Sequence, residues 1–484
     1  MTTPADPALF AATPAGSAGL LDAVRTTLAA VAPQAAPRTD RSPARLATLV
    51  ADLDVCPEDP VPFDEVVADL AGRTWQHGVQ VAHPDCAAHL HPPALTSAVA
   101  TEVAIAAANQ SLDSWDQAPA ATELELRLVG WLAHRFGLPA GATGVVTSGG
   151  TASNLLGLTL ARDRLAARSG VDVRAEGLPA GADRWRILAS DGAHFSIQRS
   201  AALLGLGHRA VVPVATDGAG RMDPVALAAE VERLTTDGHP ILAIVATAGT
   251  TDLGAVDPIA AVADVADAAG TWLHVDAAVG GAFVLSDQLR PLLAGIGRAR
   301  SVTVDLHKLW WQPIGASVLL VADAGSFDAV RTPSAYLDRP DDDASGVTNL
   351  VSRSLDTTRR FDAAKAVTSL RATGRRQLGA MLDHLVHLAT VAARAVDDDA
   401  DLVLVAEPTT VMCTFRWAGD PAADVEAQVQ RRLLASGRAI VGRTVLGGAA
   451  ALKLTFTDPT TTDEQVRALV RLVADEARAV AAGP

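Results

Sequence analysis

From residue 137 onward, short apolar runs alternate with segments of helical pattern, and this alternation constrains the fold more than any other feature of the chain. Residues 241–247 and 301–305 have the length and the β-branched composition of buried strands. Strands that alternate with helices form a mainly parallel sheet, because each crossover helix returns the chain to the same end of the sheet. We therefore predict an α/β fold for this part of the chain.

Composition narrows the classes of partner and the compartment. The sequence is 49% hydrophobic and 20% charged, as in globular proteins, and its net charge of -15 argues against a nucleic-acid or anionic membrane surface. The three cysteines are too dispersed for a disulfide framework or a zinc cluster, so a reducing cytoplasm is the expected compartment. We see no secretory signal and no apolar run of ~20 residues that would span a membrane.

Lys308 is one of only three lysines among 40 basic residues. It lies between the predicted strand 301–305 and the bulky apolar residues 309–311. A partly buried lysine can lose its proton and act as an amine nucleophile, which a guanidinium group cannot do. We therefore predict imine chemistry at Lys308, against the alternative of a solvated amine beyond a strand end. Lys365 and Lys453 fit ordinary helix and strand positions.

Two turns that follow predicted strands carry further polar groups. The first is a glycine turn that precedes a helix and offers backbone N–H groups and hydroxyls to an anion, with phosphate as the natural ligand. Its residues are Ser148, Gly149, Gly150 and Thr151. Such turns are common, so this one is informative only together with the other motifs. His194 follows the next strand, where it is either a ligand-binding residue or a capping histidine. Thr250, after residues 241–247, lies among small residues that allow a flat ligand to approach.

Asp276 ends an apolar run, and Ala277 and Ala278 leave space beside it. One helix-sized crossover and a strand separate it from Lys308, so both should lie at the carboxyl edge of the sheet, although a post-strand aspartate is often only a helix cap. Together these groups match the needs of pyridoxal phosphate. Lys308 would hold the aldehyde, Asp276 would keep the ring nitrogen protonated, and His194 would stack on the ring.

Five motifs occur in the order and spacing of a known family: Thr147-Ser-Gly-Gly-Thr151, His194-Phe-Ser196, Thr250-Thr251, His274-Val-Asp-Ala-Ala278 and Asp305-Leu-His-Lys308. The chain thereby resembles the group II pyridoxal-phosphate decarboxylases, whose fold is the aspartate-aminotransferase-like fold type I. The resemblance implies Lys308, Asp276 and His194 as catalytic residues. It implies a cofactor-binding set of Ser148, Gly149, Gly150, Thr151, His194, Thr250, Asp276, Ala278, Ser301, His307 and Lys308.

Within this family, residues 109–117, 307–313 and 349–360 are most similar to the 2,4-diaminobutyrate and siderophore-type lysine decarboxylases. The resemblance implies decarboxylation of a diamino acid, namely 2,4-diaminobutyrate, lysine or ornithine, to the amine and CO₂. The aromatic-amino-acid branch, which is the main alternative, has a loop tyrosine where this chain has Leu350. The only tyrosine here is Tyr336, so the acid that reprotonates the α-carbon stays open. Another lyase of the same fold and a cofactor-free regulatory relative are further alternatives.

A buried ammonium group on the substrate needs an acid nearby. Candidate substrate residues are His89, Asp113, Trp115, Asp116, Glu123 and Tyr336. The histidines around residue 89 are interleaved with prolines and favour a loop that enters the site, so no metal is expected.

By analogy with the fold we expect a homodimer with shared active sites. Residues 1–95 would then contribute to the dimer and the site, residues 96–375 would bind the cofactor, and residues 376–484 would form a small α/β domain.

Overall fold

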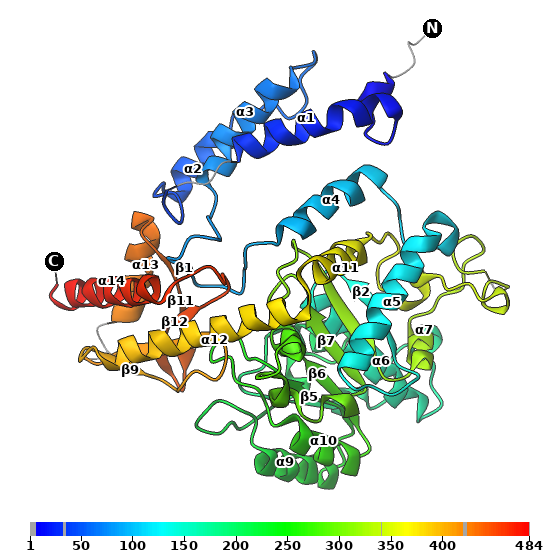
Figure 1. Cartoon of the computed structure of the whole chain (residues 1–484). Coiled ribbons are helices and arrows are strands. Elements are labelled where there is room, and N and C mark those ends of the chain that lie inside the picture. Colours follow the sequence, from blue (N-terminus) through cyan, green and yellow to red (C-terminus); the bar gives the residue numbers. More distant parts are fainter. Residues whose placement is uncertain (1–5, 32–34, 340, 420–423, 484) are drawn as a thin grey trace.

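Two β-sheets organise the chain, one of seven strands and one of five (Figure 1). The structure is a computed structural model that describes residues 6–31, 35–339, 341–419 and 424–483. The strands of the large sheet are β2 (Thr143–Thr147), β3 (Arg186–Ser190), β4 (Val211–Val214), β5 (Ile241–Thr247), β6 (Trp272–Asp276), β7 (Ser301–Asp305) and β8 (Ser317–Val321).

The large sheet is mainly parallel, as predicted. Its spatial order is β2-β8-β7-β6-β5-β3-β4, and the four pairings from β7 to β4 are all parallel. β6 and β7 are buried along their whole length, which explains their continuous apolar runs. β8 is antiparallel to both β7 and β2, because residues 306–316 are too few for a helical crossover after β7.

Helices cover both faces of the large sheet. Successive strand residues point to opposite faces, so Ile187 belongs to the core beneath α6 and α8, whereas Leu188 belongs to the core beneath α5, α9 and α10. The helices around this sheet are α5 (Pro119–Arg135), α6 (Gly150–Ala167), α7 (Val173–Glu176), α8 (Ser196–Leu203), α9 (Pro224–Thr236), α10 (Ile259–Ala268) and α11 (Asp362–Thr373).

The small sheet has the order β1-β11-β12-β10-β9. Its elements are β1 (Cys86–Ala87), β9 (Leu402–Leu404), β10 (Met412–Trp417), β11 (Ile440–Leu446) and β12 (Ala449–Thr455), with helices α12 (Arg375–Asp397), α13 (Val425–Ser436) and α14 (Asp463–Ala481). β1 comes from the N-terminal part of the chain and pairs in parallel with β11, which the sequence analysis did not predict. The helical pattern of residues 361–396 predicts one long helix, and this prediction is wrong: the chain breaks between α11 and α12 at Gly374, whose φ of 77° favours glycine.

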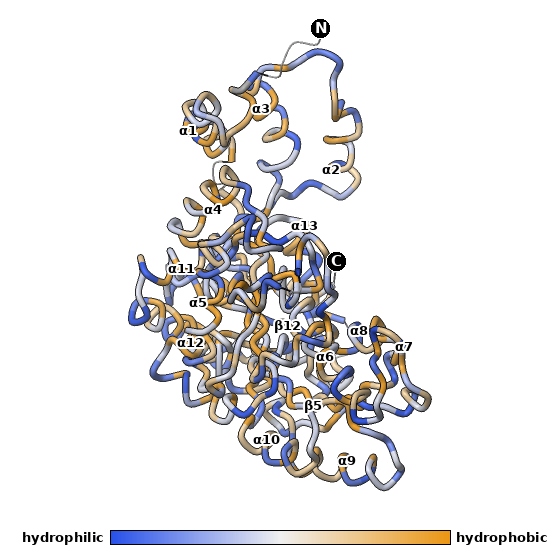
Figure 2. The backbone as a smooth tube through the Cα atoms, turned by 90° about the vertical axis from the view of Figure 1, so that its right-hand side faces the viewer, coloured by the Kyte–Doolittle hydropathy of each residue, from blue (hydrophilic) through white to orange (hydrophobic). Residues whose placement is uncertain are grey.

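The N-terminal helices stand away from the two sheets. They are α1 (Pro14–Ala30), α2 (Pro43–Val50), α3 (Phe63–Arg73) and α4 (Thr96–Ala108). α1, α2 and α3 form an arm beyond the rest of the molecule in both views (Figures 1 and 2). α1 buries none of its residues, and Leu21 and Leu28 are exposed by 72% and 60%. Within the described ranges, no helix has the length and the apolar character needed to cross a bilayer.

A buried ion pair fixes the end of the loop that precedes α11. Arg359 Nη2 lies 2.5 Å from Glu125 Oε1, and both side chains are at most 4% exposed. The same two side chains also bind β2: Glu125 Oε1 accepts from the Val146 N–H, and Arg359 donates to the Val146 carbonyl. The pair therefore holds the loop, α5 and β2 together just before the glycine turn.

We predict that Arg359→Ala destabilises the large domain by about 3–5 kcal/mol, because it leaves the Glu125 carboxylate buried without its partner. The shift in thermal unfolding measures this at a fixed cofactor concentration, since bound ligand itself raises stability. Arg298→Ala is the matched control: Arg298 pairs with Asp264 and Asp267 on the surface, so its loss should leave the transition in place. Equal shifts in the two variants would contradict the prediction.

Candidate active site

A cavity of about 580 Å³ lies where the carboxyl ends of β5, β6 and β7 meet the turn between β2 and α6. This is the edge at which open α/β sheets bind ligands. All the predicted cofactor residues except Thr250 and Ser301 line the cavity. The structure thus brings Lys308, Asp276 and His194 together around one space.

The glycine turn places the first turn of α6 at this cavity. α6 begins at Gly150, and its N-cap residue Gly149 provides no side-chain cap, so the first backbone N–H groups are available to a ligand. A Cβ atom at Gly150 would lie 3.0 Å from both carboxylate oxygens of Asp305, which explains the need for glycine there. The N-terminus of this 18-residue helix is suited to a phosphate group.

Lys308 enters the cavity from the end of β7. Its Nζ lies 3.0 Å from Asp305 Oδ2, and its side chain is 23% exposed while that of Asp305 is 2% exposed. Asp305 Oδ1 is buried and has no hydrogen-bond partner among the described residues. The sequence analysis quoted Asp305 within a motif but gave it no role, although its position three residues before Lys308 was a usable signal. His307 Nδ1 contacts the Ala316 carbonyl at 2.7 Å, which turns the other ring nitrogen toward Asp305.

Asp276 is held by one hydrogen-bond donor on each oxygen. The Ala278 N–H donates to Oδ1 at 3.1 Å and Asn154 Nδ2 donates to Oδ2 at 2.8 Å. His194 lines the same cavity, and its Nδ1 lies 2.8 Å from Ser196 Oγ. Burial lowers the pKa of His194, which favours a neutral ring able to pack against a flat ligand.

Two predicted cofactor residues lie behind the cavity wall. Thr250 Oγ1 accepts from the Ala255 N–H at 3.0 Å and closes a turn, while its neighbour Thr251 lines the cavity. Ser301 Oγ lies 2.8 Å from Trp272 Nε1 and 2.7 Å from His274 Nδ1, inside the sheet. Thr250 is thus next to a cavity residue, whereas Ser301 contacts Trp272 and His274, which do not line the cavity.

The predicted substrate residues do not line this cavity within one chain. Trp115 Nε1 donates to Glu123 Oε1 at 3.2 Å, and the Trp115 backbone N–H donates to Asn349 Oδ1 at 2.9 Å. The segment that carries Asp113 and Asp116 is therefore attached to the loop around Asn349. Tyr336, in the same loop, is 73% exposed.

Lys453 of β12 reaches the edge of the site from the five-stranded sheet. It is 7% exposed, and its Nζ donates to the Thr251 carbonyl at 2.6 Å and lies 3.4 Å from Asp252 Oδ1. Burial lowers the pKa of Lys453. Burial, and after it the charge of Lys453, lowers the pKa of His89. The sequence analysis treated Lys453 as an ordinary strand position and missed this placement.

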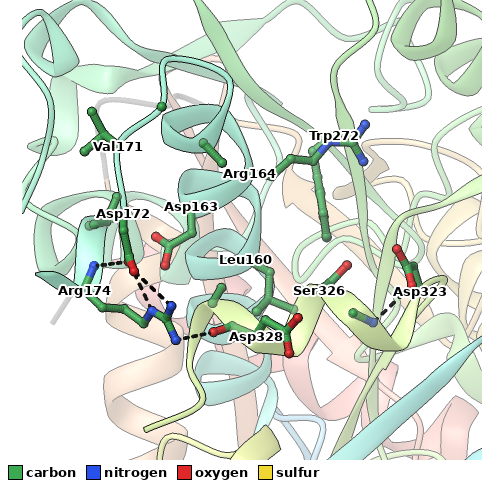
Figure 3. Close-up of a pocket in the computed structure, with 15 residues that line it drawn as sticks. Leu160, Asp163, Arg164, Val171, Asp172, Arg174, Trp272, Asp323, Ser326 and Asp328 are labelled. Atoms are coloured by element: carbon green, nitrogen blue, oxygen red, sulfur yellow. Dashed lines mark hydrogen bonds and ion pairs between the residues drawn. The ribbon is translucent and has the colours of Figure 1, made fainter.

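A second cavity, of about 640 Å³, lies at the amino end of β6, near Trp272 (Figure 3). Its charged groups are mostly engaged with the protein: Arg174 pairs with Asp172 and donates to the Asp328 carbonyl. It carries no lysine and lies at the opposite edge of the sheet from Asp276. In the described part of the chain, no group of three or more His, Cys, Asp or Glu is arranged to hold a metal ion.

Comparison with known proteins agrees with this geometry. The family described as "Pyridoxal-dependent decarboxylase conserved domain" matches residues 47–418. The chain is 40% identical to an L-2,4-diaminobutyrate decarboxylase of Rhizobium meliloti (strain 1021) over 89% of this chain and 85% of that protein. It superposes with a TM-score of 0.88 and 35% identity on the glutamate decarboxylase domain of a diaminobutyrate-pyruvate transaminase and L-2,4-diaminobutyrate decarboxylase from Vibrio parahaemolyticus, over 98% of both chains. Oryza sativa TDC with PLP and tryptamine gives a TM-score of 0.86 at 25% identity, over 96% of this chain and 99% of that one.

The cavity fits pyridoxal phosphate. An uncapped helix N-terminus suits the phosphate, a lysine amine suits the aldehyde, and a buried carboxylate suits the ring nitrogen. Ala278 is small and His194 is flat, and both line the cavity, so they suit a planar ring.

We predict that Gly150→Val weakens cofactor binding on the order of ten-fold, because its side chain would meet the buried Asp305 carboxylate and overpacking costs ~1–3 kcal/mol. Titration of the apoprotein with pyridoxal phosphate measures the dissociation constant. Gly130→Val is the control, since a Cβ at this helical glycine meets nothing within 4 Å. Unchanged binding by the Gly150 variant would refute the close approach.

Proposed function

Because this chain belongs to the pyridoxal-dependent decarboxylase family, we propose that its substrate is the diamino acid L-2,4-diaminobutyrate. The protein is a pyridoxal-phosphate-dependent amino-acid decarboxylase, which releases CO₂ and an amine. The proposed substrate is supported by the 40% identity with a diaminobutyrate decarboxylase along most of both chains. Ornithine and lysine are longer by one and two methylenes, a difference worth only ~1–3 kcal/mol per methylene in a pocket.

Bound pyridoxal phosphate supplies an electron-accepting ring for the pair left behind when CO₂ departs. We assign the covalent attachment to the Lys308 amine, oriented by Asp305 Oδ2 at 3.0 Å. Asp276 would hold the protonated ring nitrogen, the first turn of α6 would hold the phosphate, and the neutral His194 would pack against the ring. Cofactor contacts of Thr250 and Ser301 are proposed as indirect, through Thr251 and His274.

Recognition of the side-chain ammonium needs an acid that one chain does not place in the cavity. Asp276 and Asp305 line the cavity, and both are engaged, by Asn154 and Lys308 respectively. We propose that Asp113, Asp116 or Glu123 meets this ammonium from a second copy of the chain, with Trp115 and the loop of Tyr336. His89 and Lys453 lie on the small-domain side, where they suit the substrate carboxylate.

A homodimer follows from the same reasoning and from the N-terminal arm. α1 buries no residue in its own chain although it exposes Leu21 and Leu28, and apolar faces of this kind are normally covered by a partner. We also propose the cytoplasm as the compartment, which suits the unpaired state of Cys56, Cys86 and Cys413.

The second candidate is an aromatic-amino-acid decarboxylase, favoured by the superposition on Oryza sativa TDC with PLP and tryptamine. The identity with that structure is 25%, against 40% with the diaminobutyrate decarboxylase. This difference favours the diamino acid.

The function is tested by CO₂ release from L-2,4-diaminobutyrate, ornithine, lysine, tyrosine, tryptophan and glutamate. We expect kcat/KM to be highest for diaminobutyrate and roughly 10-fold or more lower for ornithine, in line with ~1–3 kcal/mol per methylene. Lys308→Ala is the control and should release no CO₂ from any substrate. Turnover of an aromatic acid alone would refute the proposed substrate and keep the decarboxylase.

The dimer is tested by analytical ultracentrifugation of a Leu21→Asp and Leu28→Asp double variant. We expect a shift of the dimer toward the monomer, because two charges would be buried at the proposed interface. Val225→Asp is the control, since Val225 is 77% exposed on α9, far from the arm. Sedimentation of the wild-type protein as a monomer would refute the proposal directly.

A further inference from the structure

A chain of buried hydrogen bonds leads from Asp276 into the sheet. Asn154 Nδ2 donates to Asp276 Oδ2 at 2.8 Å and to Ser196 Oγ at 2.9 Å. At its other end, Asn154 Oδ1 accepts from Thr303 Oγ1 at 2.7 Å and lies 2.9 Å from His274 Nε2. These side chains are at most 5% exposed, so water does not substitute for a missing partner.

The donor and acceptor types of these groups determine which atom donates in each hydrogen bond of the series. An ionised carboxylate only accepts hydrogen bonds, so the amide turns its NH₂ group toward Asp276 and its oxygen toward His274. His274 Nε2 therefore carries the hydrogen, and Nδ1 accepts from the Ser301 hydroxyl at 2.7 Å. The Ser301 oxygen in turn accepts from Trp272 Nε1 at 2.8 Å, and the Trp272 side chain faces the second cavity (Figure 3). In this series of hydrogen bonds, every polar side-chain atom therefore faces a partner of the matching donor or acceptor type.

Burial keeps the His274 ring neutral, as these donor and acceptor roles require. It is 0% exposed, and desolvation lowers its pKa to about 4, so its ring is neutral near pH 7. A glycine on α6 makes room for it: a Cβ at Gly157 would lie 2.9 Å from His274 Nδ1 and Cε1. Glycine inside a helix costs about 0.5–1 kcal/mol relative to alanine, and the close approach of His274 explains why this glycine is present.

We propose that Asn154, oriented by neutral His274, is a positioning residue that holds Asp276 in the place where it meets the ring nitrogen of the cofactor. The inference rests on the proposed role of Asp276. Asn154 and the Ala278 N–H each occupy one carboxylate oxygen, which fixes the plane of the carboxylate and leaves its remaining lone pairs for the cavity. Loss of Asn154 leaves the carboxylate free to rotate away from the ring.

The test is a double-mutant cycle read by titration of the apoprotein with pyridoxal phosphate. We expect Asn154→Ala to raise the dissociation constant about ten-fold, as for a lost hydrogen bond to a charged group. In the Asp276→Ala background the same substitution should change it by no more than about two-fold, because the two residues act through one contact. With substrate, kcat should fall while KM stays near its wild-type value.

Ser153→Ala is the matched control for the helix. Ser153 is equally buried and precedes Asn154, but its hydroxyl lies 2.7 Å from Thr147 Oγ1 and 3.1 Å from Ser317 Oγ, away from Asp276. It should bind the cofactor as the wild type does. If Asp276→Ala leaves cofactor binding unchanged, the proposed role of Asp276 fails. If Asp276→Ala weakens binding but Asn154→Ala does not, or if the two effects add, the inference is overturned and the proposed function stands.

A second pair of variants covers the case in which Asn154→Ala does not fold. His274→Gln can keep an N–H group near the position of Nε2, so we expect its cofactor affinity to stay within about three-fold of wild type. His274→Phe cannot donate to Asn154 and should lose about ten-fold. Equal affinities of the Gln and Phe variants would overturn the inference.

Discussion

The parallel pairing of β5, β6 and β7 is the constraint on which the site depends. Thr247 pairs with Asp276, and Asp276 pairs with Thr303, so β5 and β6 end level and β7 continues two residues further, to Asp305. Lys308 follows the end of β7 by a few residues and therefore arrives beside Asp276. Backbone pairing inside a sheet that is buried on both faces holds such a separation more rigidly than a loop does. The spacing between the amine and the carboxylate is thus a property of the sheet.

The sequence analysis identified candidate residues at the ends of strands, but it missed a helix residue that contacts one of them. Asp276 and Lys308 could be found because the end of each strand is visible as the end of an apolar run. Asn154 lies inside a helix, and nothing in the pattern of residues 150–167 shows that its amide meets Asp276, 122 residues later. Asp305 is the exception among the strand-end residues: its position three residues before Lys308 was a usable signal, but it was given no role. The break at Gly374 escaped because helical patterns continue on both sides of it.

The three lysines show where a compositional argument could have gone further. The rarity of lysine in an arginine-rich chain was applied to Lys308 alone, yet Lys365 is fully buried between Glu102 and Asp362, and Lys453 is buried against the Thr251 carbonyl. A compact ammonium group fits such places, whereas a planar guanidinium group needs more donors satisfied and more room. Where a chain uses arginine almost everywhere, each remaining lysine indicates a confined position.

The cavity is asymmetric in how its polar groups are held. At one end of it, Asp276, Lys308 and His194 are each held by a neighbour within one chain. Among the described residues, the acids that line the cavity are Asp276 and Asp305, and both are engaged, whereas Asp113, Asp116 and Glu123 lie on a segment tied to the loop around Asn349. α1 buries none of its residues, although it contacts α3, so we propose one source for the substrate-binding acid and for a cover over the N-terminal arm. A second copy that supplies both would couple substrate recognition to assembly, so that only the assembled protein accepts a cationic side chain.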